Sequence, residues 1–250
     1  MIKIAICGAL GKMGANILEL LNGDEQAVAF CGIDAKEETV AGIPVYDGFD
    51  KIEGKPDVII DFSSPAALKD ELEYAVKYGV PAVIGSTGFS DGQLRQIDEA
   101  ATKVAIFRTA NFSLGVNLMC ELIKKAALTL GEKFDIEIIE KHHNQKVDAP
   151  SGTALMLADS AKSAFEGGKP YLYGRHGNCG KRGKEIGLHA VRGGTIVGEH
   201  EVDFCGEDEI ITISHSARSK KVFAAGAIKA AKYLAGKPAG LYDMGDLLSD

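Results

Sequence analysis

Residues 2–22 of this chain read IKIAICGALGKMGANILELLN, and this stretch decides the fold. Its first part, 2–7, is an apolar run rich in β-branched residues, which predicts a buried strand ending at Gly8. Its last part, 15–22, carries apolar residues at helical spacing, and a second strand-like run, AVAFCGI, occupies 27–33. A strand, a glycine turn, a helix and another strand in this order predict a βαβ unit with parallel strands.

The alternation of strand-like and helix-like segments continues to about residue 110. We predict further strands at 57–62, 80–84 and 104–107, and helices at 67–78 and 90–103. A chain that alternates in this way builds a Rossmann-type, doubly wound parallel sheet with helices on both faces. The predicted fold class is therefore α/β.

The second half of the chain has a different pattern. A helix is predicted at 114–129, a strand at 134–140 and a helix at 154–165, followed by strand-like runs at 185–191, 195–204 and 209–216. Since no helices separate these last runs, they should form a mixed or antiparallel sheet. The stretch 173–184, rich in glycine, lysine and arginine, is expected to be a mobile loop.

A final helix predicted at 222–235 resembles the elements of the first half, so the end of the chain is expected to return there. We therefore predict a dinucleotide-binding domain made of residues 1–113 and 223–250. The residues between them, 114–222, would form an inserted α+β domain that binds the substrate.

Composition limits the kinds of partner. The 250 residues carry 35 acidic and 28 basic side chains, a net charge of −7, so attraction to a nucleic acid backbone is not expected. No apolar stretch approaches the roughly 20 residues that span a bilayer, and the first strand leaves no room for a signal peptide. We therefore expect a cytoplasmic protein without a membrane partner.

Cysteine spacing gives no sign of a disulfide framework or a structural zinc site. The cysteines are odd in number, widely scattered and without a CxxC pair, at Cys7, Cys31, Cys120, Cys179 and Cys205. His176 lies near Cys179, but no second close pair accompanies them, so no metal site is predicted.

The glycine turn GALGKMG at 8–14 is typical of a pyrophosphate-binding loop. Glycines let the backbone turn tightly and approach the anion, and the following helix offers free N–H groups and a positive dipole. Asp34, about 20 residues further on, would bind ribose hydroxyls. The alternative is a helix-capping loop without a ligand. Because Asp34 disfavours a 2′-phosphate and Lys36 could offset it, we hypothesise that both NADH and NADPH are used.

The segment EKHHNQKVDAPSGTA at 140–154 is the most informative for chemistry. A helix start at Ser151-Gly152-Thr153, with Lys146 and a histidine nearby, is suited to bind a carboxylate. A histidine in the same loop can deliver a proton near neutral pH. Together with a nicotinamide, these residues could reduce a C=C or C=N bond conjugated to carboxylates. The alternative is a solvated loop with an ordinary helix cap.

Other candidate motifs are weaker. His189, His200 and His215 lie in strand-like segments and are interpreted as ordinary sheet histidines. A serine hydrolase is not predicted, because neither Ser151 nor Ser86 lies in a GxSxG elbow.

With these motifs, the chain resembles the dihydrodipicolinate reductase (4-hydroxy-tetrahydrodipicolinate reductase) family of lysine and diaminopimelate biosynthesis. The resemblance runs nearly end to end and includes GALGKMG at 8–14, DFSSP at 61–65, IGSTGF at 84–89, ANFSLGVN at 110–117, EKHHNQKVDAPSGTA at 140–154, IGLHAVRGGTIVGEH at 186–200 and GLYDM at 240–244. It implies the NAD(P)H-dependent reduction of 4-hydroxy-tetrahydrodipicolinate to tetrahydrodipicolinate. It also implies a homotetramer joined through the sheet of the substrate domain.

The resemblance further implies roles for particular residues. His142 and Lys146 would be catalytic, as proton donors or acceptors. The cofactor would contact Gly8, Ala9, Leu10, Gly11, Lys12, Met13, Asp34, Gly85, Ser86, Thr87, Thr109, Ala110, Asn111 and Phe112. The cyclic dicarboxylate would contact His143, Lys146, Ser151, Gly152 and Thr153. Some relatives carry an acidic residue followed directly by arginine, whereas this chain has Asp34-Ala35-Lys36, which leaves the cofactor preference open.

Two other functions remain to be tested. A non-catalytic NAD(P)-binding redox sensor would share the fold but would not need a proton donor in the 140–154 segment. Another dehydrogenase of amino-acid metabolism would act on a different substrate; an aldehyde dehydrogenase type would need a nucleophilic cysteine near the cofactor, and none lies in a suitable loop.

Overall fold

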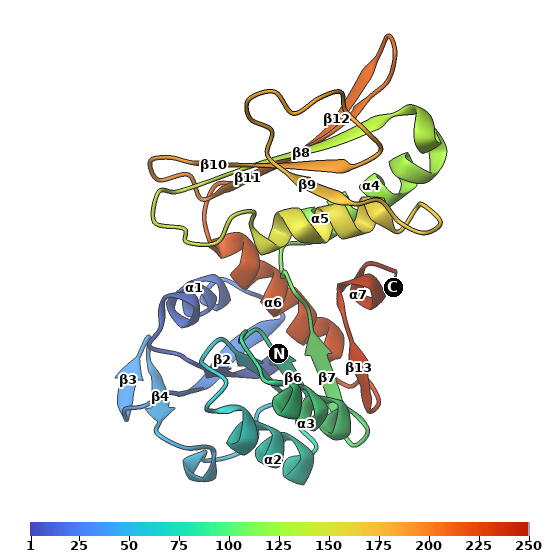
Figure 1. Cartoon of the computed structure of the whole chain (residues 1–250). Helices are drawn as coiled ribbons and strands as arrows, with labels where there is room; N and C mark the ends of the chain where they lie inside the picture. Colours follow the sequence, from blue (N-terminus) through green and yellow to red (C-terminus); the bar gives the residue numbers. More distant parts are fainter. Residues whose placement is uncertain (250) are drawn as a thin grey trace. The chain divides into compact units, whose positions relative to one another are not determined.

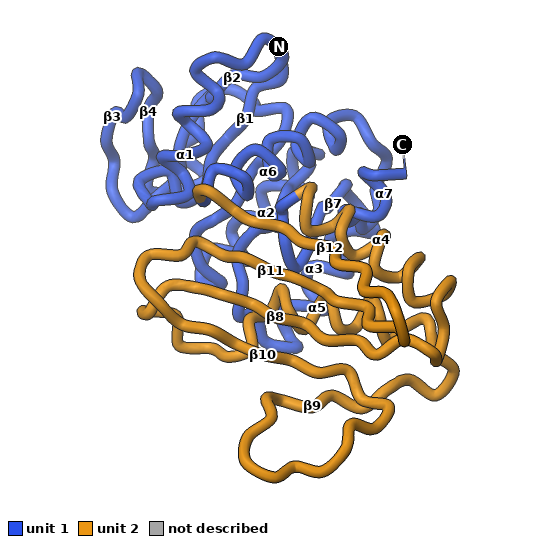
Figure 2. Tube along the Cα trace, turned by 90° about the horizontal axis from the view of Figure 1, so that it is seen from above, with its two compact units in different colours: residues 1–113, 220–250 blue, residues 114–219 orange. Residues whose placement is uncertain are grey.

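The computed structural model describes residues 1–249, which form two compact units (Figure 1). The first unit consists of Met1–Ser113 together with the segment from Lys220 to the C-terminus, and the second unit is Leu114–Ser219 (Figure 2). None of the helices in the described part of the chain is both long enough and apolar enough to cross a membrane.

An eight-stranded sheet forms the centre of the first unit, in the order β13-β7-β6-β5-β1-β2-β4-β3. Its strands are β1 (Ile2–Cys7), β2 (Ala27–Ile33), β3 (Glu38–Val40), β4 (Ile43–Tyr46), β5 (Val58–Asp61), β6 (Ala82–Ile84), β7 (Ala105–Arg108) and β13 (Gly240–Tyr242). All neighbours are parallel except β3 and β4. The chain builds outward from β1 first on the β2 side and then on the β5 side. The carboxyl ends of these strands therefore flank a topological switch point, where such sheets bind ligands.

Helices cover both faces of this sheet. Helices α1 (Lys12–Leu21) and α6 (Lys221–Leu234) lie on one face, and α2 (Leu68–Tyr78) and α3 (Asp91–Ala101) lie on the other (Figure 1). The strand period explains the two layers, because successive side chains of β1 point to opposite faces. Ala5 and Cys7 belong to the core cluster that includes residues of α2 and α3, whereas Ile4 and Ile6 are fully buried outside that cluster.

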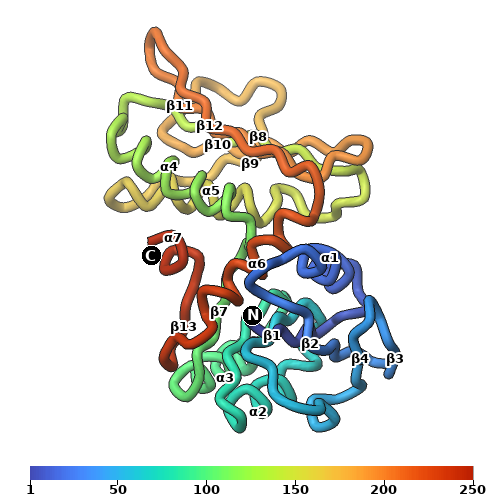
Figure 3. The backbone as a smooth tube through the Cα atoms, turned by 180° about the vertical axis from the view of Figure 1, so that it is seen from behind, coloured from blue at the N-terminus to red at the C-terminus, as the bar shows by residue number. Residues whose placement is uncertain are grey.

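The C-terminal segment completes the first unit. Strand β13 lies beside β7 and parallel to it (Figure 3), and the short helix α7 (Met244–Ser249) follows. Helix α6 is tied to the α1 side of the sheet by an ion pair between Lys232 and Asp24, 2.5 Å apart. Because α6 begins at Lys221, the expected return at residue 223 falls inside this helix.

The second unit contains a five-stranded mixed sheet in the order β12-β11-β8-β10-β9. Its strands are β8 (Asp135–His142), β9 (Tyr171–Tyr173), β10 (Ile186–Arg192), β11 (Gly198–Cys205) and β12 (Ile210–Ala217). Strand β8 pairs with β10 in parallel and with β11 antiparallel. Helices α4 (Leu114–Leu130) and α5 (Gly152–Lys162) pack on one face, where even-numbered residues of β8 such as Ile136 and Ile138 are buried.

The predicted fold class is confirmed, with differences in the short elements. Not predicted were β3, β4, β9, β13, α7 and the 3-10 turns Phe49–Lys51 and Gly131–Lys133. The missed strands are short and mostly exposed or half-buried, so they lack the continuous apolar run that marks the equally short but buried strands β5, β6 and β7. The strand predicted at 195–204 begins instead at Gly198, since residues 193–197 form the turn that follows β10.

Candidate active site

The glycine turn has the shape of a phosphate-binding loop because glycine occupies three of its positions, 8, 11 and 14. Gly8 has a φ of +80°, and a Cβ there would lie 2.8 Å from the carbonyl oxygen of Phe62. A Cβ on Gly14 would lie 2.3 Å from the Gly8 carbonyl oxygen, so glycine lets α1 start directly against the turn. The Gly8 N–H donates to Ile33 O at 2.8 Å, and Gly11 N–H donates to Gly8 O at 3.1 Å. The backbone of this turn is therefore bare and fixed.

Asp34 lies at the end of β2, next to the glycine turn. Its carboxylate accepts hydrogen bonds from the N–H groups of Leu10, at 2.9 Å, and Ala35, at 2.8 Å. A cavity of about 580 Å³ opens here, and among the described residues that line it are Gly8, Gly11 and three carboxylates, Asp34, Asp47 and Asp70, but no lysine or arginine. Lys36 is thus not part of this lining.

The remaining residues of the turn have different exposure. Ala9 is buried beneath Gly32, where a Cβ would lie 2.6 Å from that of Ala9. Lys12 is exposed and Met13 half-buried, at the start of α1.

The loops that follow β5 and β6 are joined by Asp61, whose side chain is buried. Its carboxylate accepts hydrogen bonds from the N–H of Ser63, at 2.8 Å, from the Ser63 hydroxyl and from the Ser86 hydroxyl. Gly85 packs so closely that its Cβ would lie 2.6 Å from the Phe62 ring, whereas Thr87 is exposed. Sequence reasoning missed this role of Asp61, although the residue opens the DFSSP motif.

The segment after β7 presents mainly backbone. Thr109 Oγ1 donates to Asn111 O and accepts from Asn111 N–H, and Ala110 between them is exposed. The Phe112 side chain is buried, with its ring 5.4 Å from that of Phe62. The Phe112 ring is therefore part of the packed interior beneath this segment.

In the second unit, a fully buried carboxylate stands beside the predicted catalytic histidine. Glu140 and His142 lie on the same, buried face of β8, and His142 Nδ1 is 2.6 Å from Glu140 Oε2. His142 lies across from Gly198 of β11, where a Cβ would come within 3.1 Å of His142 Nε2. Glycine at this position therefore places no side chain of its own against the Nε2 edge of the ring.

Arg192, at the end of β10, forms a two-pronged ion pair with the same carboxylate. Its Nη1 and Nη2 donate to the two oxygens of Glu140 at 2.8 and 2.7 Å, and Nη2 also donates to Asp148 O at 2.6 Å. One guanidinium thus joins the strand that carries His142 to the loop that carries Lys146.

The start of α5 is held by Glu140 and by a second histidine. Ser151 N–H donates to Glu140 Oε1 at 2.9 Å, and the Ser151 hydroxyl caps the helix by accepting from Ala154 N–H at 3.1 Å. The same hydroxyl is 3.1 Å from Nε2 of His200, whose ring is edge-on to His142 with centroids 5.2 Å apart. His200 was interpreted as an ordinary sheet histidine, but it belongs to this cluster.

The other predicted substrate residues surround the cluster. Lys146 Nζ pairs with Asp148 Oδ1 at 2.8 Å, and 23% of the Lys146 side chain is exposed. His143 and Thr153 are half-buried, and Gly152 is exposed at the first position of α5.

Charge in the cluster is concentrated on one carboxylate and the cations around it. Burial by itself would raise the pKa of Glu140, but hydrogen bonds from Arg192, His142 and Ser151 N–H outweigh it and hold that pKa below its ordinary value. Burial, and then the neighbouring His142, lower the pKa of His200 to about 4. His200 is therefore neutral at physiological pH.

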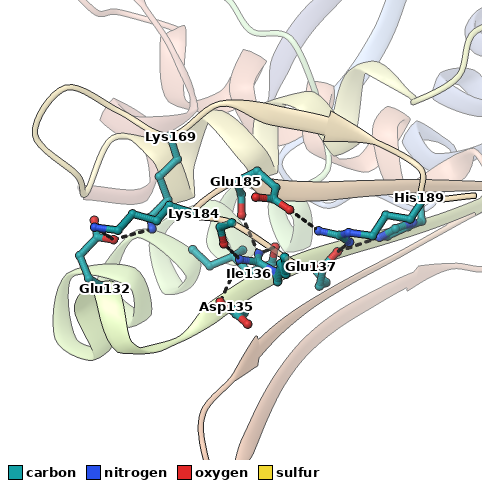
Figure 4. A network of polar contacts seen from close by, with 11 residues as sticks. Glu132, Asp135, Ile136, Glu137, Lys169, Lys184, Glu185 and His189 are labelled. Atoms are coloured by element: carbon teal, nitrogen blue, oxygen red, sulfur yellow. Dashed lines mark hydrogen bonds and ion pairs between the residues drawn. The ribbon is translucent and has the colours of Figure 1, made fainter. Parts of the chain in front are cut away.

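A second polar network connects the stretch 173–184, which was expected to be mobile, to the sheet (Figure 4). Glu137, on the opposite face of β8 from Glu140, accepts hydrogen bonds from Arg175 and Arg182 at 2.9 Å each and lies 2.7 Å from His189 Nε2. Arg182 also donates to Asp135, at 2.8 Å. The 173–184 stretch is thus anchored to the sheet at two arginines. Within residues 1–249, no three His, Cys, Asp or Glu side chains are grouped as metal ligands, around His176 and Cys179 or elsewhere.

Comparison with protein families covers almost the whole chain. Residues 2–112 match the family model described as the N-terminus of dihydrodipicolinate reductase, and residues 115–248 match the model of its C-terminus.

Curated relatives agree with the family models. The 4-hydroxy-tetrahydrodipicolinate reductase of Caldanaerobacter subterraneus subsp. tengcongensis is 47% identical over 99% of this chain and 98% of that protein. The enzyme of the same name from Clostridium novyi is 44% identical, over 99% of this chain and 98% of that protein.

Solved structures show the same fold. A dipicolinate-bound dihydrodipicolinate reductase from Paenisporosarcina sp. TG-14 is similar with a TM-score of 0.81 and 27% identity, covering 97% of each chain. An Agrobacterium radiobacter oxidoreductase in complex with NAD⁺, L-tartaric acid and magnesium shares the fold alone, with a TM-score of 0.58 and 12% identity over 99% of this chain and 92% of that one. The chain therefore belongs to the dihydrodipicolinate reductase family of oxidoreductases.

Proposed function

We propose that this protein catalyses the NAD(P)H-dependent reduction of 4-hydroxy-tetrahydrodipicolinate to tetrahydrodipicolinate in lysine and diaminopimelate biosynthesis. The relatives that carry this name match the chain over nearly its full length. The observation that carries the proposal is the cluster at the end of β8, where a histidine, a buried carboxylate and an arginine meet the start of a helix.

The first unit would bind the pyridine nucleotide. The fit is supported by the glycine turn, whose three missing side chains leave bare backbone beside the start of α1, and by Asp34 in the adjoining cavity. In this proposal Gly8–Met13 hold the pyrophosphate and Asp34 holds a ribose, while 85–87 and 109–112 contact the rest of the molecule. When bound, the reduced nicotinamide supplies a hydride. Both NADH and NADPH are proposed as donors.

The second unit would bind the dicarboxylate and handle the proton. The start of α5, at Ser151, Gly152 and Thr153, suits one carboxylate of the substrate, because helix N-termini favour anions. Lys146 and His143 would add a cation and a hydrogen-bond donor. His142 would hold the transferred proton at Nε2, since its Nδ1 is already occupied by Glu140.

The test is the oxidation of NADH and of NADPH, followed by absorbance in parallel assays. The substrate would be generated in place from pyruvate and aspartate semialdehyde by the preceding synthase. We expect oxidation that depends on the synthase. A folded protein that binds NADH but oxidises neither cofactor would contradict the proposed reaction and favour a redox sensor or a different substrate.

We further propose a cytoplasmic homotetramer joined through the sheet of the second unit. The outer strand β12 supports this arrangement, because Ile210 and Ile211 are exposed on it. Light scattering after size exclusion would measure the mass, and a monomer at micromolar concentration would contradict this part of the proposal.

A further inference from the structure

Glu140 is the most heavily hydrogen-bonded carboxylate of the proposed substrate site. Three N–H groups from outside β8 donate to it: two belong to the Arg192 guanidinium and one is the backbone N–H of Ser151. The remaining contact is His142 Nδ1. Since the Glu140 side chain is 0% exposed, these groups take the place of water.

We infer that Glu140 and Arg192 are positioning residues for the reduction: Glu140 locks His142 in the tautomer protonated at Nδ1, and Arg192 keeps Glu140 in the anionic form that does so. The inference rests on the proposed function, because it assigns His142 Nε2 as the atom at which the proton is held. It adds two residues that do not touch the reacting atoms but decide how His142 can act.

The protonation of Glu140 follows from its partners. A carboxylate that accepts both prongs of a guanidinium has to be ionised to use both oxygens as acceptors. Ser151 N–H adds a further donor, and the pKa of Glu140 lies below its ordinary value although burial opposes this. An ionised carboxylate can only accept, so the hydrogen between Glu140 Oε2 and His142 Nδ1 belongs to the histidine.

This tautomer leaves Nε2 as the atom of His142 that can take up a proton. With Nδ1 protonated, the neutral ring carries its lone pair on Nε2, and a proton taken up there can be passed on from there. The Nε2 edge faces Gly198, which has no side chain to cover it. His200 flanks the ring but remains neutral, so it adds no second positive charge beside a protonated His142.

Arg192 has a second effect on the same site. Besides holding both oxygens of Glu140, it donates to the carbonyl oxygen of Asp148, whose side chain pairs with Lys146. Loss of the fork would therefore release the anchor of Glu140 and the loop that carries Lys146 together. Lysine cannot replace it, because an ammonium does not reproduce the planar fork.

The first measurement needs no substrate. Long-range proton–nitrogen NMR of histidine-labelled protein reports the tautomer of each neutral ring, and His142→Gln identifies the His142 signals. We expect the Nδ1–H form in the wild-type protein and a mixture of both tautomers in Glu140→Gln, since the amide can donate to Nδ1. A wild-type His142 protonated at Nε2 would overturn the inference, even if the proposed reaction were observed.

The second measurement is kinetic. We expect Glu140→Gln to lower kcat by about 100-fold, and Arg192→Lys by about tenfold, with KM changed less than kcat. The dissociation constant for NADH should stay within a factor of about 2, because the cofactor residues lie in the first unit. Glu137→Gln is the matched control, as it alters a carboxylate with arginine and histidine partners on the opposite face of the same strand. It should leave the His142 tautomer and kcat unchanged.

The outcomes separate the two proposals. Absence of turnover in the wild-type protein would contradict the proposed function, while the tautomer would still test the Glu140 contact. Normal turnover with a kcat for Glu140→Gln within threefold of wild type would overturn the positioning roles and leave the function standing. If Glu140→Gln does not fold, the wild-type tautomer and Arg192→Lys decide the question.

Discussion

The glycine turn of the first unit and the Glu140 cluster of the second are built in opposite ways. The turn is a local structure made of backbone, and its shape depends on side chains that Gly8 and Gly14 lack. The Glu140 cluster is made of side chains from three strands and a helix start, with partners 11 and 52 residues away in sequence. The turn needs an exposed backbone without side chains, whereas the cluster needs all of its hydrogen-bond partners. Substitutions should therefore fail for different reasons: added atoms in the turn, and lost partners in the cluster.

The largest effect is expected for Lys146→Ala. Removing the cation from the loop after His142 should lower kcat by about a thousandfold, because a neutral methyl group cannot stabilise the developing charge. NADH binding, followed by fluorescence titration, should persist. Lys141→Ala, which removes a lysine paired with Glu199 at 3.5 Å, is the control and should keep near-normal turnover. Near-normal kcat in Lys146→Ala would show that the assignment is wrong.

Gly14→Ala tests the bare surface of the turn. Alanine normally favours a helix over glycine by about 1 kcal/mol. Here its Cβ would lie 2.3 Å from the Gly8 carbonyl oxygen, so we expect a loss of about 3 kcal/mol in the free energy of unfolding, measured with urea. NADH affinity should fall as well. Gly23→Ala, where nothing lies within 4 Å of the added Cβ, should be close to neutral. Equal effects of the two changes would contradict the close-approach argument.

Because His200 is buried in the cluster, we expect the protein to lose stability in acid. His200 has a pKa of about 4 in the folded protein, below the ordinary value of 6.5, so the unfolded chain binds more protons than the folded one between these values. The contribution of neutral His200 to the free energy of unfolding is full above pH 6.5 and is lost as the pH falls toward 4. From pH 6.5 to 5 the loss should be about 2 kcal/mol for this group.

The comparison with His200→Gln isolates this effect. Urea unfolding at a series of pH values should give a shallower dependence for the variant, because glutamine does not titrate. Identical pH dependences of the free energy of unfolding in both proteins would mean that His200 binds its proton as readily in the folded state as in the unfolded state.

The smallest effect is expected at Asp34. Asp34→Asn removes one of three carboxylates from the cofactor cavity, so a 2′-phosphate should be disfavoured less. We expect the ratio of kcat/KM for NADPH over NADH to rise about tenfold, equivalent to about 1.4 kcal/mol. Glu37→Gln, whose carboxylate pairs with Lys51 at 2.7 Å and is not among the residues that line the cavity, is the control. An unchanged ratio in Asp34→Asn would contradict a role of Asp34 in cofactor choice.

Much of the first unit could be predicted from the sequence, because its signals are local. The strand before Gly8, the glycine spacing and the helical pattern after it each depend on backbone preferences within a few residues. The α/β fold was predicted from such signals and the family from the resemblance of motifs along the whole chain, and both are confirmed. The residue assignments for cofactor and substrate remain predictions.

Only the tertiary structure decided the composition of the Glu140 cluster. From the sequence alone the segment 140–154, with His142, Lys146 and the helix start at Ser151, was predicted to carry the chemistry, but there was no reason to select Arg192, Gly198 or His200. Those residues meet because the strand register aligns His142 with Arg192 and Glu140 with His200. A shift of one residue would turn each side chain to the other face of the sheet. Register depends on the packing of whole strands against α4 and α5, and no short stretch of sequence encodes it.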